Sequence, residues 1–89
     1  MPRVSEFYGI VIAIYFDDVG RHHRAHFHAQ HAEHRAVYGI PDGDLIAGSL
    51  PRRQQRLVQA WAAVRQDELE QAWARALNDE PPGRIDPLT

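Results

Sequence analysis

The sequence predicts an α+β fold in which an antiparallel β-meander of about four strands packs against a C-terminal helical segment. Two observations lead to this prediction. The first half of the chain holds short runs of β-branched and aromatic residues separated by short polar or turn-forming segments, which favours antiparallel neighbours. From Pro51 onward the apolar residues recur at helical spacing instead.

The first predicted strand covers the apolar run Tyr8 to Phe16. Both of its faces are apolar, which indicates a central strand under helical cover. Further strands are expected at His26 to Gln30 and at His34 to Ile40. The segment Pro41 to Asp44 has the composition of a tight turn. This turn should fold a fourth strand, Leu45 to Leu50, back onto the third.

The helical segment carries two apolar stripes, rotated roughly a quarter-turn from one another. We therefore expect a break near Gln66, giving two helices or one kinked helix. Ser49 is a candidate cap for the first part, and Asp67 with Glu70 has the spacing of a capping box. The stripes consist of Leu57, Trp61 and Val64, with Val58 and Ala60 beside them, and then of Leu69, Ala72, Trp73, Ala76 and Leu77.

Length and composition predict one domain over residues 1–89, with a β-rich part at 7–50, a helical part at 51–78 and an extended Pro-rich tail at 79–89. The absence of cysteine excludes disulfide frameworks and cysteine-ligated metal sites. A net charge of −2 argues against a generally basic nucleic-acid binder. No membrane span or signal peptide is evident, so the sequence favours a cytoplasmic protein that does not contact a membrane.

All six histidines lie in the segment 22–34. His26 and His28 are two positions apart on a predicted strand, so their rings should project from the same face. Two neutral imidazoles on one face are good ligands for zinc or nickel. The third ligand would be His34, His31 or Glu33.

A second interpretation of the cluster needs no metal or other cofactor. Arg24 and Arg35 accompany the histidines, and segment 21–35 is formally +2. Such a patch can hold phosphate, with His26 or His28 as general acid or base and Arg24 stabilising the transition state, as in a metal-independent ribonuclease. Arg35 would contact phosphate or a partner. A solvated loop and strand edge without chemistry is the remaining alternative.

Arg52, Arg53 and Arg56 form a second basic group at the start of the helical segment. Cations at a helix N-terminus oppose the helix dipole. A phosphate, an acidic partner, or the acids Asp42 and Asp44 in the preceding turn would offset them. The three arginines are therefore candidate phosphate- or partner-binding residues. The two tryptophans are expected as core anchors.

Taken together, short motifs along nearly the whole chain resemble a bacterial domain-of-unknown-function family, family 4160. The motifs are Ser5-Glu6-Phe7-Tyr8-Gly9-Ile10, Tyr15-Phe16-x-Asp18, His26-Phe27-His28-Ala29, Leu50-Pro51-x-Arg53, Leu57-Val58-x-x-Trp61-Ala62, Glu68-Leu69, Trp73 and Ile85-x-Pro87-Leu88. The family usually has Pro-Pro before His-Phe-His, where this chain has Arg24-Ala25. The stretch before His26 is also longer than usual, which places His22 and His23 outside the family pattern.

The resemblance implies an α+β fold and no established activity. Genes of this family look like accessory cargo beside a second small gene, an arrangement similar to toxin–antitoxin pairs. We therefore expect a small cytosolic component of such a pair, with a small protein partner encoded nearby. RNA and a second copy of the chain are further candidate partners. The alternative is a small protein that binds zinc or nickel through His26, His28 and His34.

Overall fold

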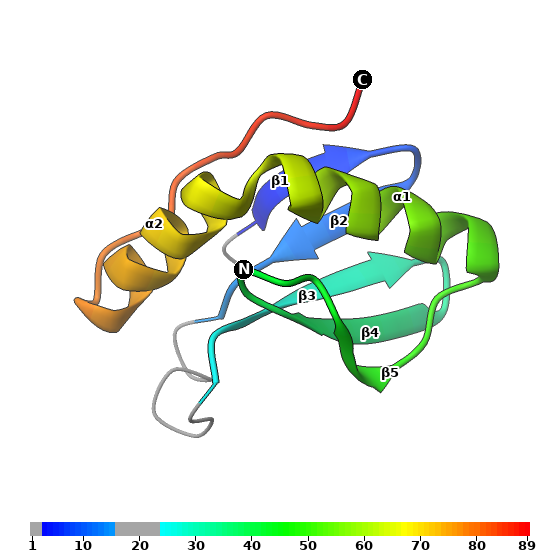
Figure 1. Cartoon of the computed structure of the whole chain (residues 1–89), viewed down its shortest axis with the longest axis horizontal. Coiled ribbons are helices and arrows are strands. Elements are labelled where there is room, and N and C mark those ends of the chain that lie inside the picture. The colour runs from blue at the N-terminus through cyan, green and yellow to red at the C-terminus, as the bar shows by residue number, and fades with distance from the viewer. Residues whose placement is uncertain (1–2, 16–23) are drawn as a thin grey trace.

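The computed structural model describes residues 3–15 and 24–89, and in this part of the chain five antiparallel strands form one sheet beside two helices (Figure 1). The strands stand in sequence order across the sheet. The predicted α+β class is confirmed, with one strand more than expected. The elements are β1 (Arg3–Phe7), β2 (Ile10–Ala13), β3 (His26–His31), β4 (His34–Gly39), β5 (Leu45–Gly48), α1 (Arg52–Val64) and α2 (Gln66–Leu77).

The additional strand arises from a turn inside the first apolar run. Tyr8 and Gly9 have φ values of 49° and 76°, and the hairpin around them pairs Phe7 with Ile10. The expectation of one strand from Tyr8 to Phe16 was therefore wrong, and Phe16 itself lies outside the described residues. A single glycine gives access to the left-handed turn conformation without interrupting the apolar pattern, so the pattern alone hides this turn.

The second half of the sheet follows the prediction closely. β3 pairs with β4 from His26 opposite Gly39 to His31 opposite His34. The predicted turn after Ile40 is present, with Gly43 at φ 73°, and β5 folds back onto β4. β5 ends at Gly48, two residues before the predicted end.

The helical segment is broken at Arg65, beside the predicted position, and gives two helices. Neither helix has a side-chain cap, so the predictions for Ser49 and for the capping box were wrong. Pro51 occupies the N-cap position of α1. Arg65 is the single residue between the two helices. Its carbonyl oxygen accepts the N–H of Leu69 at 2.9 Å, so the hydrogen bonding of α2 begins at this residue. Neither helix is long and apolar enough to cross a membrane.

The core lies between the helices and one face of the sheet. Trp61 is completely buried there, with its ring centroid 5.4 Å from that of Phe7 and 5.7 Å from that of Phe27. The buried stripe of α1 is rotated relative to the predicted one, since Val58, Trp61 and Ala62 are buried while Leu57 is only half-buried and Val64 is exposed. In α2, Leu69, Ala72 and Ala76 are buried as expected, but Leu77 is exposed.

The tail after α2 runs back to β1, the first strand of the sheet (Figure 1). The N–H of Ile85 donates to the carbonyl oxygen of Val4 in β1 at 2.7 Å. The indole Nε1 of Trp61 donates to the carbonyl oxygen of Asp86 at 2.8 Å. The tail is not helical, and these bonds attach it to both layers of the fold.

Candidate functional site

Strand β3 lies between β2 and β4, and its alternation separates the histidine pair from the core. Phe27 is fully buried against Trp61 on the face that the helices cover. His26 and His28 alternate with Phe27 and so project from the other face of the strand, with their ring centroids 5.3 Å apart. At the start of the strand α2 reaches this face as well, because its Trp73 packs against His26. The structure thus brings the two histidines together as the strand pattern predicts.

His26 is held on three sides. The residue as a whole is only 3% exposed. The ring packs against Trp73 of α2 at a centroid distance of 5.1 Å and against His28. Its Nδ1 lies 3.0 Å from the backbone oxygen of Arg24. Because a carbonyl oxygen can only accept, Nδ1 is the donor in this hydrogen bond.

His28 is half-buried and reaches a shallow recess on this face. Tyr15 meets its ring edge-on at a centroid distance of 4.6 Å. The recess has a volume of about 130 Å³. Its lining combines apolar side chains with two histidines and one arginine. Its lining residues are Arg24, His26, His28, Val37, Ile46 and Ala47.

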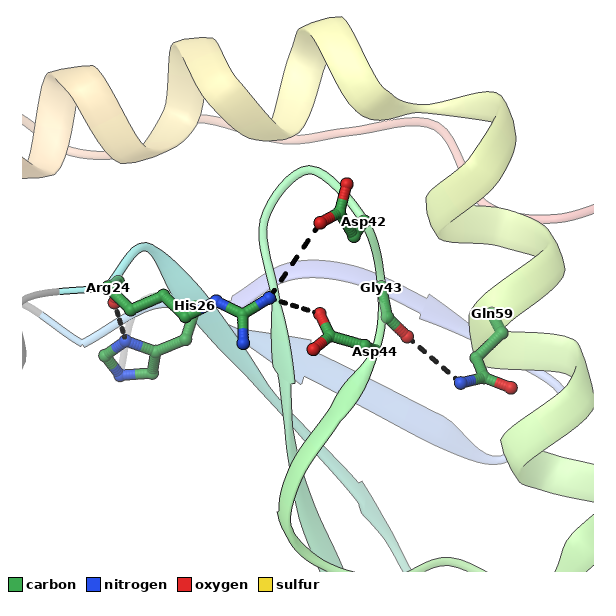
Figure 2. Close-up of polar contacts among 6 residues, drawn as sticks. All are labelled: Arg24, His26, Asp42, Gly43, Asp44 and Gln59. Atoms are coloured by element: carbon green, nitrogen blue, oxygen red, sulfur yellow. Dashed lines mark hydrogen bonds and ion pairs between the residues drawn. The ribbon is translucent and has the colours of Figure 1, made fainter.

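Arg24 reaches across to the turn between β4 and β5 (Figure 2). Its guanidinium donates to the carboxylate of Asp44 and lies 4.0 Å from that of Asp42. The hydrogen bond from Arg24 holds the pKa of Asp44 below its usual value. The acids of this turn therefore pair with Arg24. Of the three alternatives given for the arginines of the helix, the one in which Asp42 and Asp44 offset them was wrong.

Gly39 gives this ion pair its room. A Cβ at Gly39 would lie 2.5 Å from Oδ1 of Asp44 and 2.6 Å from Nη2 of Arg24, far closer than such atoms approach. The backbone N–H of Gly39 also donates to the backbone carbonyl oxygen of Asp44 at 2.9 Å. A side chain at this position would displace the contact between the turn and Arg24.

The same turn is fastened to α1. Nε2 of Gln59 donates to the carbonyl oxygen of Gly43 at 3.1 Å (Figure 2). A chain of contacts thus runs from Gln59 through the turn to Arg24, whose own backbone oxygen orients the ring of His26. Helix, turn and strand together fix the position of the buried histidine.

The remaining candidate arginines lie away from this group. Arg35 is paired with Gln30, four positions along β4 from Gly39, which corresponds to roughly 13 Å of extended strand. Its carbonyl oxygen accepts the N–H of Ser49 at 3.0 Å, just before α1. Arg52, Arg53 and Arg56 are exposed at the start of α1, and none of them forms a salt bridge within residues 3–15 and 24–89.

The predicted metal set of His26, His28 and His34 is not brought together. His34 stands at the opposite end of the β3–β4 hairpin, where it contacts Glu33 at 3.6 Å. Nδ1 of His31 donates to the carbonyl oxygen of Gly9 at 3.1 Å. In the part of the chain that the structure covers, no three histidine or carboxylate side chains are grouped to hold a metal ion. His22 and His23 lie outside it.

Sequence reasoning missed the roles of Asp44, Gly39 and Gln59. A signal for Asp44 was present, because Arg24 directly precedes β3 and Asp44 follows β4, and an antiparallel hairpin brings those two ends together. Trp73 was expected as a core residue, and it is packed against the core, but its contact with His26 depends on where α2 lies. No local signal indicates Gln59.

A comparison with protein-family models matches residues 9–74 to the family described as Domain of unknown function (DUF4160). The matched segment includes the histidine pair, Arg24, the turn that holds it and both helices up to Trp73. No curated protein and no solved structure matches the chain significantly. Since the model covers well over half of the sequence, the chain belongs to the DUF4160 family.

Proposed function

We propose that the chain is one component of a toxin–antitoxin-like pair of small proteins, and that it binds its protein partner at the recess beside His26 and His28. The observation that carries the proposal is the make-up of this recess. Exposed apolar side chains of Ile46 and Ala47 adjoin the imidazole of His28 and the guanidinium of Arg24. A volume of about 130 Å³ accommodates one side chain of a partner.

Protein interfaces use such places as anchors. A central side chain, often aromatic, fills a pocket with apolar walls and a few polar groups, and it contributes much of the binding energy. The recess lies within the region that the family model matches. The gene arrangement that the family resemblance implies supports a small protein as the occupant.

The geometry favours binding over catalysis. Arg24 is the cation that a phosphate would need, and Asp44 and Asp42 already neutralise it. These carboxylates also repel a phosphate that approaches the pair. His26 is 3% exposed, which restricts its access to a substrate. Cleavage of RNA is thus the weaker form of the proposal, and metal binding lacks a third ligand among the described residues.

The test is co-expression with the product of the adjacent gene, with growth scored for each protein alone and for both together. The tagged chain should co-purify with that product. Cells that express both proteins should grow at a different rate from cells that express one of the two alone. His28→Ala and Arg24→Ala should lose the partner while circular dichroism shows a retained fold. Arg84→Ala, at an exposed arginine of the tail, is the matched control and should behave like the wild type.

Two results would contradict the proposal. One is a wild-type chain that neither retains the adjacent gene product nor changes growth. The other is specific cleavage of purified RNA by the chain alone that His28→Ala abolishes, since this would assign the recess to catalysis.

A further inference from the structure

The two edges of the sheet differ in how they are protected. On the outer strand β1, Arg3 and Glu6 form a salt bridge at 3.2 Å, and the tail binds the backbone of Val4. On β5 all four residues are exposed, and none is charged. No other described strand pairs with the outer side of β5.

Natural sheets guard free edges with charges, proline, bulges, short strands or covering segments. Of these, β5 has a short length and one irregularity but no charge and no proline. Leu45 is 40% and Ile46 is 44% exposed, so both are among the five large hydrophobic residues that are exposed in the described structure. Ile46 is an extra residue between the partners of Val37 and Tyr38. This irregularity lets both Ile46 and Ala47 reach the recess on the open face.

The flanks of β5 carry opposite charges. Asp42 and Asp44 precede the strand, and they share one cation, Arg24. The side chain of Asp42 is 73% exposed, and its contact with Arg24 is 4.0 Å long. After the strand come Arg52 and Arg53, which form no salt bridge in the described part of the chain.

We propose that a second copy of the chain docks antiparallel on β5, with a two-fold axis near Ile46. An antiparallel arrangement places the acidic flank of each strand opposite the basic flank of the other. The flanks of β5 are therefore complementary to themselves, and a two-fold axis satisfies each contact twice. The same pairing covers the apolar middle of β5. It also joins the two sheets edge to edge, so that their faces opposite the helices form one continuous surface.

The first test measures the mass of the chain alone by sedimentation equilibrium or light scattering, so its outcome does not depend on the partner proposed above. The expected mass is twice the 10.2 kDa of one chain. Ile46→Lys should give the mass of one chain, because it places a charge at the axis. Val64→Lys is the matched control at another exposed apolar residue, and it should remain a dimer.

The second test addresses the charged flanks and the position of the axis. Asp42→Arg should weaken the dimer, and adding Arg52→Asp to the same chain should restore it. Because the chain has no cysteine, Ile46→Cys introduces a single thiol that a short thiol-to-thiol cross-linker should join between two copies, whereas Val64→Cys should stay uncross-linked. A wild type that is monomeric at its highest soluble concentration, or a dimer that Ile46→Lys leaves intact, would overturn the proposal.

Discussion

Replacing Trp61 with phenylalanine should weaken the attachment of the C-terminal tail as well as the core. In the folded protein the indole fills the space between Phe7 and Phe27, and its Nε1 donates to the oxygen of Asp86. Phenylalanine keeps most of the ring contacts and loses the donor. The lost hydrogen bond contributes about 0.5 to 1.5 kcal/mol, and the smaller ring adds about 1 kcal/mol.

We therefore expect Trp61→Phe to lower the free energy of unfolding by about 1.5 to 2.5 kcal/mol, and Trp61→Ala to lower it by about 3 to 5 kcal/mol. Urea unfolding followed by circular dichroism measures both changes. Because small domains have total stabilities of about 5 to 15 kcal/mol, the alanine variant should be close to unfolding.

The contribution of the tail is separated by a double-mutant cycle with Ile85→Ala. Ile85 is buried next to the residue that Trp61 binds, and its own N–H holds Val4. Once either anchor is lost, the other holds the tail less firmly. The two changes should therefore be non-additive by about 0.5 to 1.5 kcal/mol. Additivity to within about 0.3 kcal/mol would refute the idea that Trp61 stabilises the tail through this bond.

Further predictions concern single positions. Gly48→Ala should lower the free energy of unfolding by more than about 2 kcal/mol. Gly48 has φ 68°, and an added Cβ would lie 2.3 Å from the backbone oxygen of Arg35. A variant as stable as the wild type in urea unfolding would contradict this prediction. Asp44→Asn should lower stability at neutral pH but not in acid. Arg24 lowers the pKa of Asp44 in the folded state. The stability that the ion pair contributes is therefore present above the pKa of Asp44 in the unfolded chain, and it disappears as the pH falls through the pKa in the folded protein. An equal difference in stability between wild type and Asp44→Asn at every pH would argue against the ion pair. Gly39→Ala should displace Arg24 from Asp44 and raise the carboxyl pKa toward its usual value, which NMR titration of Asp44 measures; an unchanged titration would show that the pair tolerates a Cβ.

The strands and helices of this protein follow from local patterns to a large extent. Alternating and β-branched runs predicted the hairpins from His26 to Gly48, and the turn composition after Ile40 predicted where they reverse. A change in the direction of the apolar stripe predicted the break beside Gln66. These signals are local because each depends on the periodicity of one element.

The incorrect predictions concern places where a local sequence pattern is compatible with two different structures. An apolar run with one glycine reads as one long strand, and only the pairing of Ile10 with Phe7 of β1 shows that the run begins with a turn and continues as β2. The charges of the turn after β4 had two possible cationic partners. Register placed Arg24 next to Asp44, and it left the arginines of α1 without an acid in the described structure.

The sequence by itself determined that His26 and His28 share a face, since residues two apart on any strand do so. It also contained the family motif that includes them. Only the tertiary structure decided what surrounds them. Packing of α2 buries His26 beneath Trp73, and the antiparallel register puts His34 at the far end of the hairpin. Contacts between residues distant in the chain depend on how elements pack, which no local period encodes. In the described part of the chain the pair therefore lines a recess, and no third histidine or carboxylate is grouped with it.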